Sequence, residues 1–386
     1  MTAREHDLNE IREAVAKLCA TFPMEYWRET DRERRYPAEF VRALTQAGWL
    51  SCLIPEQYGG AGLGISAACA VLEEIQKSGA NGAACHAQMY TMGTVLRHCN
   101  DAQKAKYLPK IAAGELRLQA FGITEPTAGT DTSSIRTAAV KKGDRYVVNG
   151  QKVWTSRAEH SDLMLLLART TPREQAQKKT DGMSVFIVDM KSSLGRGLAI
   201  RPIRTMINHA TTEIFFDNLE VPAENLVGEE GKGFRYILDG MNAERILIGA
   251  ECVGDARWFI AKASAYARER EVFGRPIGQN QGVQFPIARA YMATESAALM
   301  VERAAKLYEA GRPCGPESNM AKQLAAEASW QAGDMCLQTH GGFGFAEEYD
   351  VERKLRETRL YQIAPISTNL VLCYLAEHVL DLPRSY

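Results

Sequence analysis

The first third of the chain repeats apolar side chains at three- and four-residue spacing, which is the period of an amphipathic helix. At about residue 118 this period gives way to short runs rich in β-branched and aromatic residues. From Gly233 the helical period returns and continues almost to the C-terminus. The order along the sequence is therefore helical, then β, then helical.

These patterns predict individual elements. In the first zone we expect helices over residues 8–22, 37–50, 65–80 and 83–99. In the second zone we expect strands over 145–156, 162–170, 183–190 and 212–222, with Asn149-Gly150 as a hairpin-turn signal. The third zone predicts one unusually long helix over 234–271, followed by helices over 282–311, 317–340 and 367–380.

The zones predict three domains in an α+β chain: an N-terminal helical domain over 1–117, a middle β domain over 118–228 and a C-terminal helical bundle over 229–386. No internal repeat and no low-complexity linker interrupts this division. A chain of 386 residues is long enough to bury a large core in such an arrangement.

Composition narrows the possible functions. The formal net charge of −1 gives no electrostatic reason to expect nucleic acid or an anionic membrane as partner. No apolar run reaches the roughly 18 residues of a membrane span, and the charged N-terminus does not resemble a signal or transit peptide. The nine cysteines are dispersed without a C-x-x-C pair, and the histidines are dispersed too. We therefore expect a cytoplasmic, reducing location, no disulfides and no metal site.

Two stretches at the start of the β zone carry residues suited to a ligand. FGITEPTAGTDTSS (121–134) combines hydroxyl side chains with Gly129 beside a proline turn, so it can offer several N–H and O–H donors to a phosphate or a polar ring. VWTS (153–156) places a flat tryptophan beside two hydroxyls. On pattern alone, an ordinary turn is the leading interpretation of the first stretch, and a half-buried core tryptophan is the alternative for the second.

Glycines and arginines in the other zones have similarly open readings. RERE-VFGRPIGQNQGVQF (268–285) gathers arginines near a helix end, as a solvated face or as a phosphate contact. THGGFGF (339–345) is a helix C-cap or a place where the backbone approaches a ligand. GLGISA (62–67) fits G-x-G-x-x-A, but its helical surroundings exclude the βαβ unit that a dinucleotide fingerprint needs.

The candidate acid of the chain lies in the long helix. GMNAERILIGA (240–250) places Glu244 beside Arg245 at the edge of an apolar run. An acid at such a place is solvated in most proteins, and the pattern alone also allows a catalytic carboxylate. By contrast, RLYQIAPISTNL (359–370) has the polar lining of a site, yet no acid occurs between Glu357 and Glu377.

Taken together, these motifs resemble the acyl-CoA dehydrogenase family over nearly the whole chain. FGITEPTAGTD is similar to the family's ITEP-x-AGSD loop, with Thr130 where serine is common, and NGQKVWTS is similar to its NG-x-K-x-W-I-T segment. RERxVFGRPIGQNQGVQF and QTHGGFGF resemble its two later flavin-binding stretches. Four such stretches in the right order are far more specific than any one of them.

The resemblance implies FAD as cofactor, a middle domain built as a β-barrel or sandwich, a C-terminal four-helix bundle and a homotetrameric assembly. The stretches expected to line the flavin within one chain are Phe121, Ile123, Thr124 and Thr130, then Trp154, Thr155 and Ser156, and finally Ser367, Thr368 and Asn369. A neighbouring subunit is expected to supply Arg270, Phe273, Gln281, Gln338, Thr339, His340, Gly341 and Gly342. Thr130, Asn242 and Arg245 match positions near the bound acyl-CoA.

The reaction implied is α,β-dehydrogenation of an acyl-CoA thioester. A carboxylate removes the α-proton while the β-hydride goes to the flavin, and electrons pass to electron-transfer flavoprotein or another acceptor. Many family members carry the base in a YEGT-like loop, where this chain has Ala364-Pro365-Ile366. The isovaleryl-CoA and long-chain branches place it before an arginine in the long helix, as in L-x-x-E-R-L. NAERIL matches that pattern, so we expect Glu244 to be the base.

Two other hypotheses remain. The missing loop acid is also compatible with a relative of altered chemistry, such as an enoyl-CoA reductase, a desulfinase or a nitroalkane oxidase. A flavoprotein that binds DNA, like the family's alkylation-response relatives, would carry an added basic C-terminal region, whereas this sequence ends in LDLPRSY. We expect an acyl-CoA dehydrogenase of fatty acid or acyl-CoA catabolism, without nucleic-acid or membrane partners.

Overall fold

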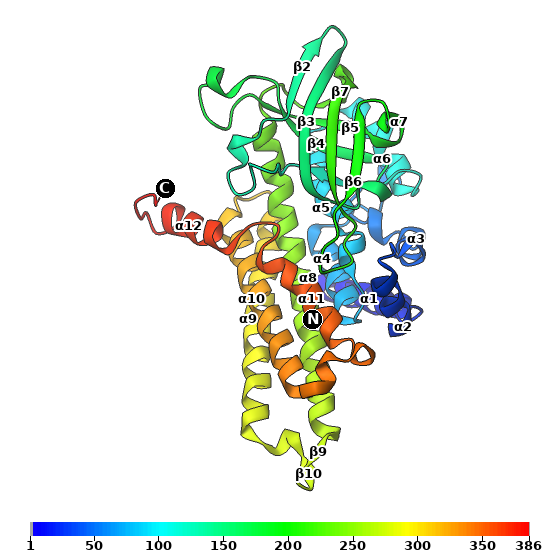
Figure 1. Ribbon diagram of the computed structural model, residues 1–386, viewed down its shortest axis with the longest axis vertical. Coiled ribbons are helices and arrows are strands. Elements are labelled where there is room, and N and C mark those ends of the chain that lie inside the picture. Colours follow the sequence, from blue (N-terminus) through cyan, green and yellow to red (C-terminus); the bar gives the residue numbers. More distant parts are fainter. Residues whose placement is uncertain (1–2, 386) are drawn as a thin grey trace. The chain divides into compact units, whose positions relative to one another are not determined.

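The computed structural model describes residues 3–385 (Figure 1). The chain divides into two compact units that interleave along the sequence. The sheet unit comprises 36–63 and 83–241, and the helical unit comprises the residues up to 35, 64–82 and those from 242 on. The division into domains 1–117, 118–228 and 229–386 stays a prediction. Within residues 3–385, no helix has both the length and the hydropathy that crossing a membrane demands.

The helices are α1 (Ala3–Cys19), α2 (Met24–Glu33), α3 (Ala38–Gln46), α4 (Ile65–Lys77), α5 (His86–His98), α6 (Asp101–Ala112), α7 (Met190–Ser193), α8 (Gly233–Glu269), α9 (Gln281–Glu309), α10 (Gly315–His340), α11 (Val351–Arg359) and α12 (Thr368–His378). The strands are β1 (Leu118–Gly122), β2 (Ala138–Lys142), β3 (Arg145–Ser156), β4 (Leu163–Arg169), β5 (Met183–Asp189), β6 (Leu198–Pro202), β7 (Thr211–Pro222), β8 (Leu226–Val227), β9 (Glu271–Val272) and β10 (Arg275–Pro276). The expected α+β order of helical, β-sheet and helical parts is confirmed, and so is the long helix α8.

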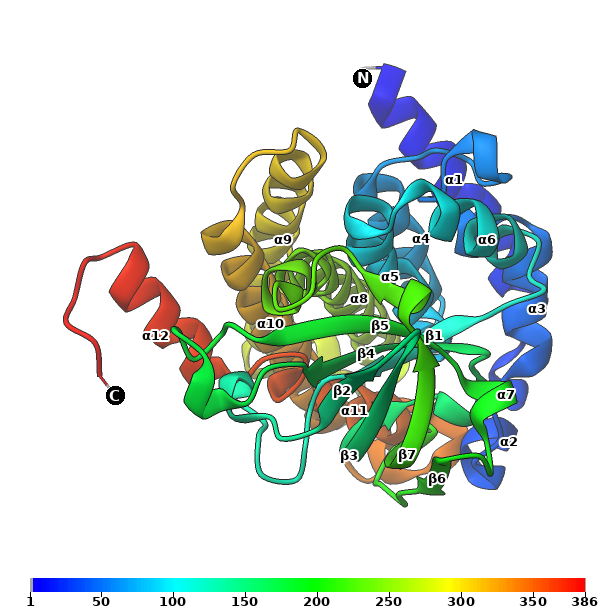
Figure 2. The same cartoon turned by 90° about the horizontal axis from the view of Figure 1, so that it is seen from above.

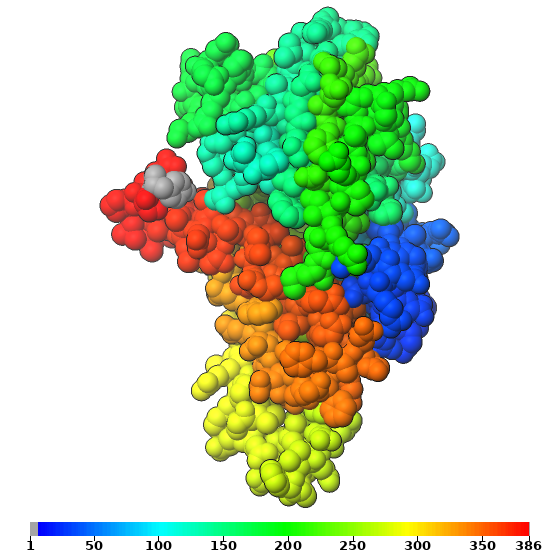
Figure 3. Space-filling model, viewed as in Figure 1, coloured from blue at the N-terminus to red at the C-terminus, as the bar shows by residue number. Residues whose placement is uncertain are grey.

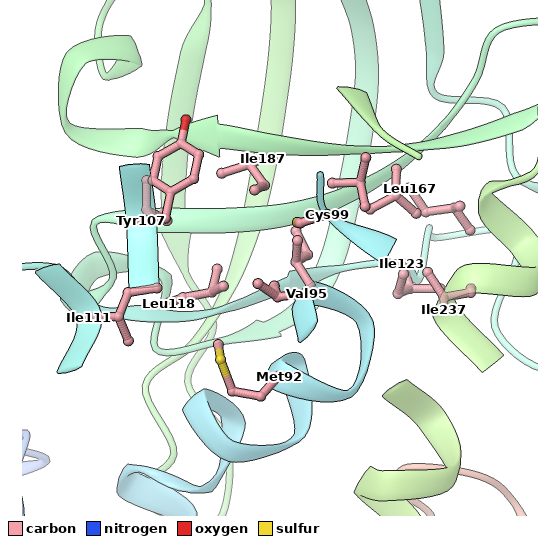
Figure 4. Packing of buried hydrophobic residues seen from close by; sticks show 14 of the residues in the cluster. Met92, Val95, Cys99, Tyr107, Ile111, Leu118, Ile123, Leu167, Ile187 and Ile237 are labelled. Atoms are coloured by element: carbon pink, nitrogen blue, oxygen red, sulfur yellow. The ribbon is translucent and has the colours of Figure 1, made fainter. Parts of the chain in front are cut away.

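One sheet forms the centre of the sheet unit, with strand order β6-β7-β3-β2-β4-β5-β8 and β1 paired with β4. Figure 2 shows β5 and β7 running in clearly different directions, as expected of a twisted sheet. Side chains alternate between its two faces. Leu165 and Ile187 pack on one face with α5 and α6, whereas Met164 and Phe186 pack on the other. Figure 4 shows the first of these layers.

The hairpin predicted at Asn149-Gly150 is wrong. Strand β3 runs straight through these residues, and the turn lies at Gly143-Asp144, between β2 and β3. Asn149-Gly150 instead marks a shift in the β3–β7 register, a β-bulge, with Gly150 at φ +147°. The Asn149 side chain accepts a hydrogen bond from the backbone N–H of Asn218 on β7 at 2.8 Å. Asn-Gly therefore serves the bulge, because the left-handed backbone that favours a tight turn also suits a bulge.

The helical unit is built around α8, α9 and α10, with α11 packed against them (Figure 1). The contact layer combines Phe259 of α8 with small residues of the facing helices, such as Ala290 and Ala332, so the helices approach closely. All nine cysteines lie in the described part of the chain, and none forms a disulfide. The hairpin of β9 and β10 closes the far end of the α8–α9 pair (Figures 1 and 3).

Candidate functional site

In the sheet unit, three hydrogen bonds fix the loop that follows β1 to strand β3. Lys152 of β3 is fully buried, and its Nζ donates to the carbonyl oxygen of Ile123 and to Oε1 of Glu125, both at 2.9 Å. The backbone N–H of Val153 also donates to the carbonyl oxygen of Thr124 at 2.9 Å. These three bonds hold the start of the FGITEP loop beside the VWTS strand, so the two predicted flavin stretches are neighbours.

The Glu125 carboxylate also binds the far end of the loop, at residues 136 and 137. It accepts hydrogen bonds from the backbone N–H groups of Arg136 at 2.6 Å and Thr137 at 2.9 Å. Burial by itself would raise the pKa of Glu125, but the Lys152 charge and the hydrogen bonds outweigh it and lower that pKa. Burial lowers the pKa of Lys152 to about 8 despite the attraction of Glu125. The pair therefore ties together both ends of loop 123–137.

Trp154, one of the residues expected to line the flavin, is largely exposed. The β3–β7 register shifts between Lys152 and Thr155, and Trp154 adopts φ +61° with 59% of its surface exposed. The hydroxyl of Thr155 is buried and has no hydrogen-bond partner within the described residues. An exposed flat ring beside an unsatisfied buried hydroxyl fits a planar, polar ligand such as the flavin ring.

The remaining residues of this stretch differ in what they present. Ile123 is buried in the core layer with Ile237, so its backbone rather than its side chain is available to a cofactor (Figure 4). Phe121 and Thr124 are half-buried, and Thr130 is exposed. The sequence did not single out Glu125, Lys152 or Arg157, the residue after Ser156. A lysine within the strand-like run 145–156 would have been the signal for Lys152, whereas Glu125 lies in the loop after β1.

In the helical unit, the proposed base and its neighbours occupy α8. Glu244 is half-buried, between the buried Ala243 and the half-buried Arg245. Nη1 of Arg245 donates to Oδ1 of Asn242 at 3.0 Å. Nε of Arg245 is buried without a partner among the described residues, and burial lowers the pKa of Arg245 while the Glu244 charge opposes that shift. Asn242 and Arg245 are thus brought together, with a donor left for a ligand.

The loop between α11 and α12 contains no acid and is held in place by a lysine of α10. Nζ of Lys322 on α10 donates to the carbonyl oxygen of Ile366 at 2.8 Å. Ser367 caps α12, its Oγ accepting from the N–H of Leu370 at 3.4 Å, so this hydroxyl already has a structural role. Thr368 is half-buried and Asn369 exposed. Nε2 of Gln362 is buried with no partner in residues 3–385.

The residues expected to serve a neighbouring subunit gather at the other end of α8. The Arg270 guanidinium lies 5.8 Å from the ring centre of Phe343, just beyond the 338–342 stretch at the end of α10. Phe273 in the hairpin is fully exposed at φ +54°. Gln281 and Gln338 are also exposed.

The glycine turn after α10 leaves room for a ligand. A methyl group added to Gly341 or Gly342 would meet no atom within 4 Å, although φ +59° favours glycine at Gly341. His340 stacks on Tyr266 with ring centres 4.2 Å apart, and its Nε2 is buried without a partner in the described chain. The Thr339 hydroxyl is already bonded to the Met335 carbonyl at 2.8 Å. Open glycines beside exposed amide side chains fit the close approach of a phosphate-bearing cofactor.

Comparison with known proteins assigns all three parts of the chain to domains of one protein family. Residues 5–115, 120–219 and 231–377 match the N-terminal, middle and C-terminal domains of acyl-CoA dehydrogenase. An acyl-CoA dehydrogenase of Bacillus subtilis (strain 168) is 35% identical over 336 residues, 86% of this chain and 87% of that protein. The acryloyl-CoA reductase (NADH) of Anaerotignum propionicum is 33% identical over 341 residues, 87% of this chain and 84% of that protein.

Among solved structures, a glutaryl-coenzyme A dehydrogenase in complex with glutaryl-CoA superimposes with a TM-score of 0.92 at 30% identity, covering 100% of this chain and 97% of that one. The chain belongs to the acyl-CoA dehydrogenase family of FAD-dependent oxidoreductases acting on CH–CH bonds.

Proposed function

We propose that this enzyme oxidises an acyl-CoA thioester to the trans-2-enoyl-CoA, with Glu244 as the base. The observation that carries the proposal is the half-buried Glu244 on α8, next to Arg245, in a chain with no acid between Glu357 and Glu377. The loop that holds the base in many relatives instead presents Ala364-Pro365-Ile366 and is fixed by Lys322. A half-buried carboxylate at the edge of an apolar helix face is suited to taking a proton from a weakly acidic carbon.

The residues of the chain would divide the work as follows. FAD, when bound, supplies the acceptor for the hydride. Trp154 and the Thr155 hydroxyl offer a flat surface and a hydrogen-bond partner to its ring, and the Lys152–Glu125 pair keeps the loop of Ile123 and Thr124 beside it. Glu244 accepts the α-proton. Asn242 and Arg245 orient the acyl-CoA, and their bond to each other reduces the freedom that binding must remove.

We also propose that a second copy of the chain completes the flavin site. Arg270 follows Glu244 by 26 residues, nearly all in the single helix α8, which separates them by about 39 Å. One flavin dinucleotide does not span that distance, so Arg270, Gln281 and the 338–342 stretch would serve the flavin of a neighbour. The fully exposed Phe273 supports this reading.

The helix α9 offers a surface for that assembly. Its exposed apolar side chains recur along one side at helical spacing: Phe285, Tyr291, Met292 and Leu299. A closed homotetramer would cover them. We further propose electron-transfer flavoprotein as the electron acceptor, acyl-CoA catabolism as the role, the cytoplasm as the location and 1–117, 118–228 and 229–386 as the domains.

An enoyl-CoA reductase is the second candidate. Two observations favour it: the missing loop acid, and the acryloyl-CoA reductase among the similar proteins. A desulfinase shares the first of these. The half-buried Glu244 keeps dehydrogenation in front, because it supplies the carboxylate that the loop lacks; in the reductive direction the same carboxyl group would return the proton to the α-carbon.

Anaerobic titration of the purified holoenzyme tests the proposal. Saturated acyl-CoAs of different length and branching are added one at a time, and bleaching of the oxidised flavin is followed. Reduction by at least one of them, with the enoyl-CoA as product, supports a dehydrogenase. If all fail while the prereduced enzyme is reoxidised by enoyl-CoAs, the reductase takes its place.

A further inference from the structure

A buried arginine next to the flavin stretch forms no ion pair. Arg157 directly follows Ser156, is 2% exposed and adopts φ +58°, with its backbone N–H donating to the carbonyl oxygen of Ala210 at 2.7 Å. Its side chain turns into the interior of the sheet unit, where Nη1 donates to the carbonyl oxygen of Ala83. The proposed function makes no use of this group.

The neighbours of the Arg157 guanidinium are the carbonyl oxygen of Ala83 and two imidazole nitrogens. Nη2 lies 3.2 Å from Nε2 of His86, and Nη1 lies 3.4 Å from Nε2 of His209. Burial first, and then the charge of Arg157, hold the pKa of His209 well below its ordinary value, so that imidazole is neutral. Across residues 3–385 no carboxylate pairs with Arg157, and its Nε is buried without a partner.

Other buried cations of the chain have their charge balanced by carboxylates or their N–H groups satisfied by backbone carbonyls. Lys152 pairs with Glu125, and Arg353 pairs with Glu357 at 2.9 Å. Arg169 also lacks an acid, but every one of its side-chain nitrogens donates to a backbone carbonyl, the pattern of a group that organises loops. Of these four cations, only Arg157 has neither a carboxylate partner nor a complete set of side-chain hydrogen bonds, since the unpartnered Nε of Arg353 belongs to a guanidinium that pairs with Glu357. A buried charge without a partner costs several kcal/mol, which an incoming anion would offset.

A short line of rings connects this cluster with the flavin stretch. The rings of Phe121 and Tyr90 lie 5.9 Å apart, and those of Tyr90 and His86 lie 5.5 Å apart. Phe121 and Ser156 are both residues assigned to the flavin. Within the sheet unit, two side chains, Tyr90 and His86, thus link the ring of Phe121 to the Arg157 guanidinium.

We propose that Arg157 recognises a carboxylate carried at the far end of the acyl chain, so that the preferred substrates are mono-CoA thioesters of dicarboxylic acids. A carboxylate suits this place for two reasons. It neutralises the buried charge, and it can accept from Nε and from the second hydrogen of Nη2, in the forked geometry that guanidinium groups favour. This inference rests on the proposed function, since it needs an acyl-CoA in the site.

The test uses matched thioesters and the holoenzyme. Anaerobic flavin reduction is measured with dicarboxylic thioesters from succinyl- to pimelyl-CoA, each against the monocarboxylic acyl-CoA of equal carbon count, from butyryl- to heptanoyl-CoA. We expect the best dicarboxylic substrate to exceed its partner at least about tenfold in kcat/KM, the value of one charged hydrogen bond. This comparison needs no variant and so does not depend on how a variant folds.

Variants then assign the preference to the residue. Arg157→Gln should remove it by lowering kcat/KM for the dicarboxylic member, while Arg157→Lys, which keeps the charge without the fork, should retain part of it. FAD content is measured for each variant. Reduction of the parent by monocarboxylic thioesters as readily as by dicarboxylic ones overturns this inference and leaves the dehydrogenase standing. Reduction by neither series overturns both.

Discussion

Nζ of Lys152 lies 2.9 Å from Oε1 of Glu125, and both side chains are buried beneath the loop that starts the flavin stretch. The pair is the point at which strand β3 and the FGITEP loop are joined. The loop is exposed at its tip, at Thr127, Gly129 and Thr130. The order of this exposed loop thus depends on an ion pair buried beneath it.

Removing one member of this pair should therefore impair cofactor binding. Lys152→Met leaves the Glu125 carboxylate buried without a counter-ion, and the loss of a buried partner typically costs about 3–5 kcal/mol. We expect a lower free energy of unfolding and a lower FAD content after purification, measured by urea denaturation and by flavin absorbance.

Lys142→Met is the matched control, because Lys142 is exposed at the end of β2. It should behave like the parent in both assays. If Lys152→Met retains full FAD and parental stability, the pair does not hold the loop.

The bulge at Gly150 gives a second prediction. A methyl group there would lie 2.6–2.8 Å from atoms of Thr137, and φ +147° already disfavours other residues. Gly150→Ala should cost about 1–3 kcal/mol through overpacking. Gly282→Ala on α9 meets no atom within 4 Å and should leave stability equal or higher. Equal urea midpoints for both variants and the parent would contradict the bulge geometry.

Acid should destabilise the sheet unit through His209. Its pKa is held well below the ordinary value by burial, assisted by Arg157, although the residue keeps some exposed surface. The unfolded chain therefore takes up a proton on this group first, as pH falls below about 6.5. Stability due to the neutral imidazole is present above that pH and is lost on acidification.

His209→Asn should accordingly flatten the decline of unfolding free energy between about pH 7 and about pH 5, by at most about 1.4 kcal/mol per pH unit. The exposed His378 provides the control, His378→Asn, which should keep the parental slope. An unchanged slope in His209→Asn would show that this imidazole is protonated in the folded protein.

Arg270 tests the shared flavin site. Arg270→Ala removes a cation from the exposed end of α8, and a lost charged hydrogen bond of about 1.5–3 kcal/mol should weaken FAD retention tenfold or more. Arg268→Ala, two residues earlier and equally exposed, should not. FAD retention is measured by dialysing each protein against flavin-free buffer and following the fluorescence of the flavin that remains bound. Light scattering measures the oligomeric state. A parent protein that is monomeric yet fully loaded with FAD would refute a site completed by a second copy.

Periodicity predicted most of the architecture because long amphipathic helices and buried strands are governed by local spacing. Helix α8 and strands β4 and β5 follow from it directly. The Asn149-Gly150 error has the opposite origin: the same backbone preference serves a turn or a bulge, and only pairing with β7 decides between them.

The grouping of candidate site residues was predictable where a motif keeps them in one short stretch, and less so where a role depends on distant partners. Lys152 and Glu125 are 27 positions apart, and the surroundings of Arg157 come from residues 71 to 74 positions earlier and 52 to 53 later. The hydroxyl of Ser367 caps α12, and its role at the flavin stays a prediction.

The central claim is that Glu244 is the base, and one substitution addresses it most directly. Glu244→Gln keeps the size and hydrogen-bonding capacity of the side chain and removes its basicity, while Glu269→Gln changes an exposed acid at the end of the same helix. With a good acyl-CoA, stopped-flow flavin reduction by Glu244→Gln should fall at least about a hundredfold, with FAD and acyl-CoA binding nearly unchanged, and Glu269→Gln should match the parent. Reduction of Glu244→Gln as fast as the parent would show that another group takes the proton.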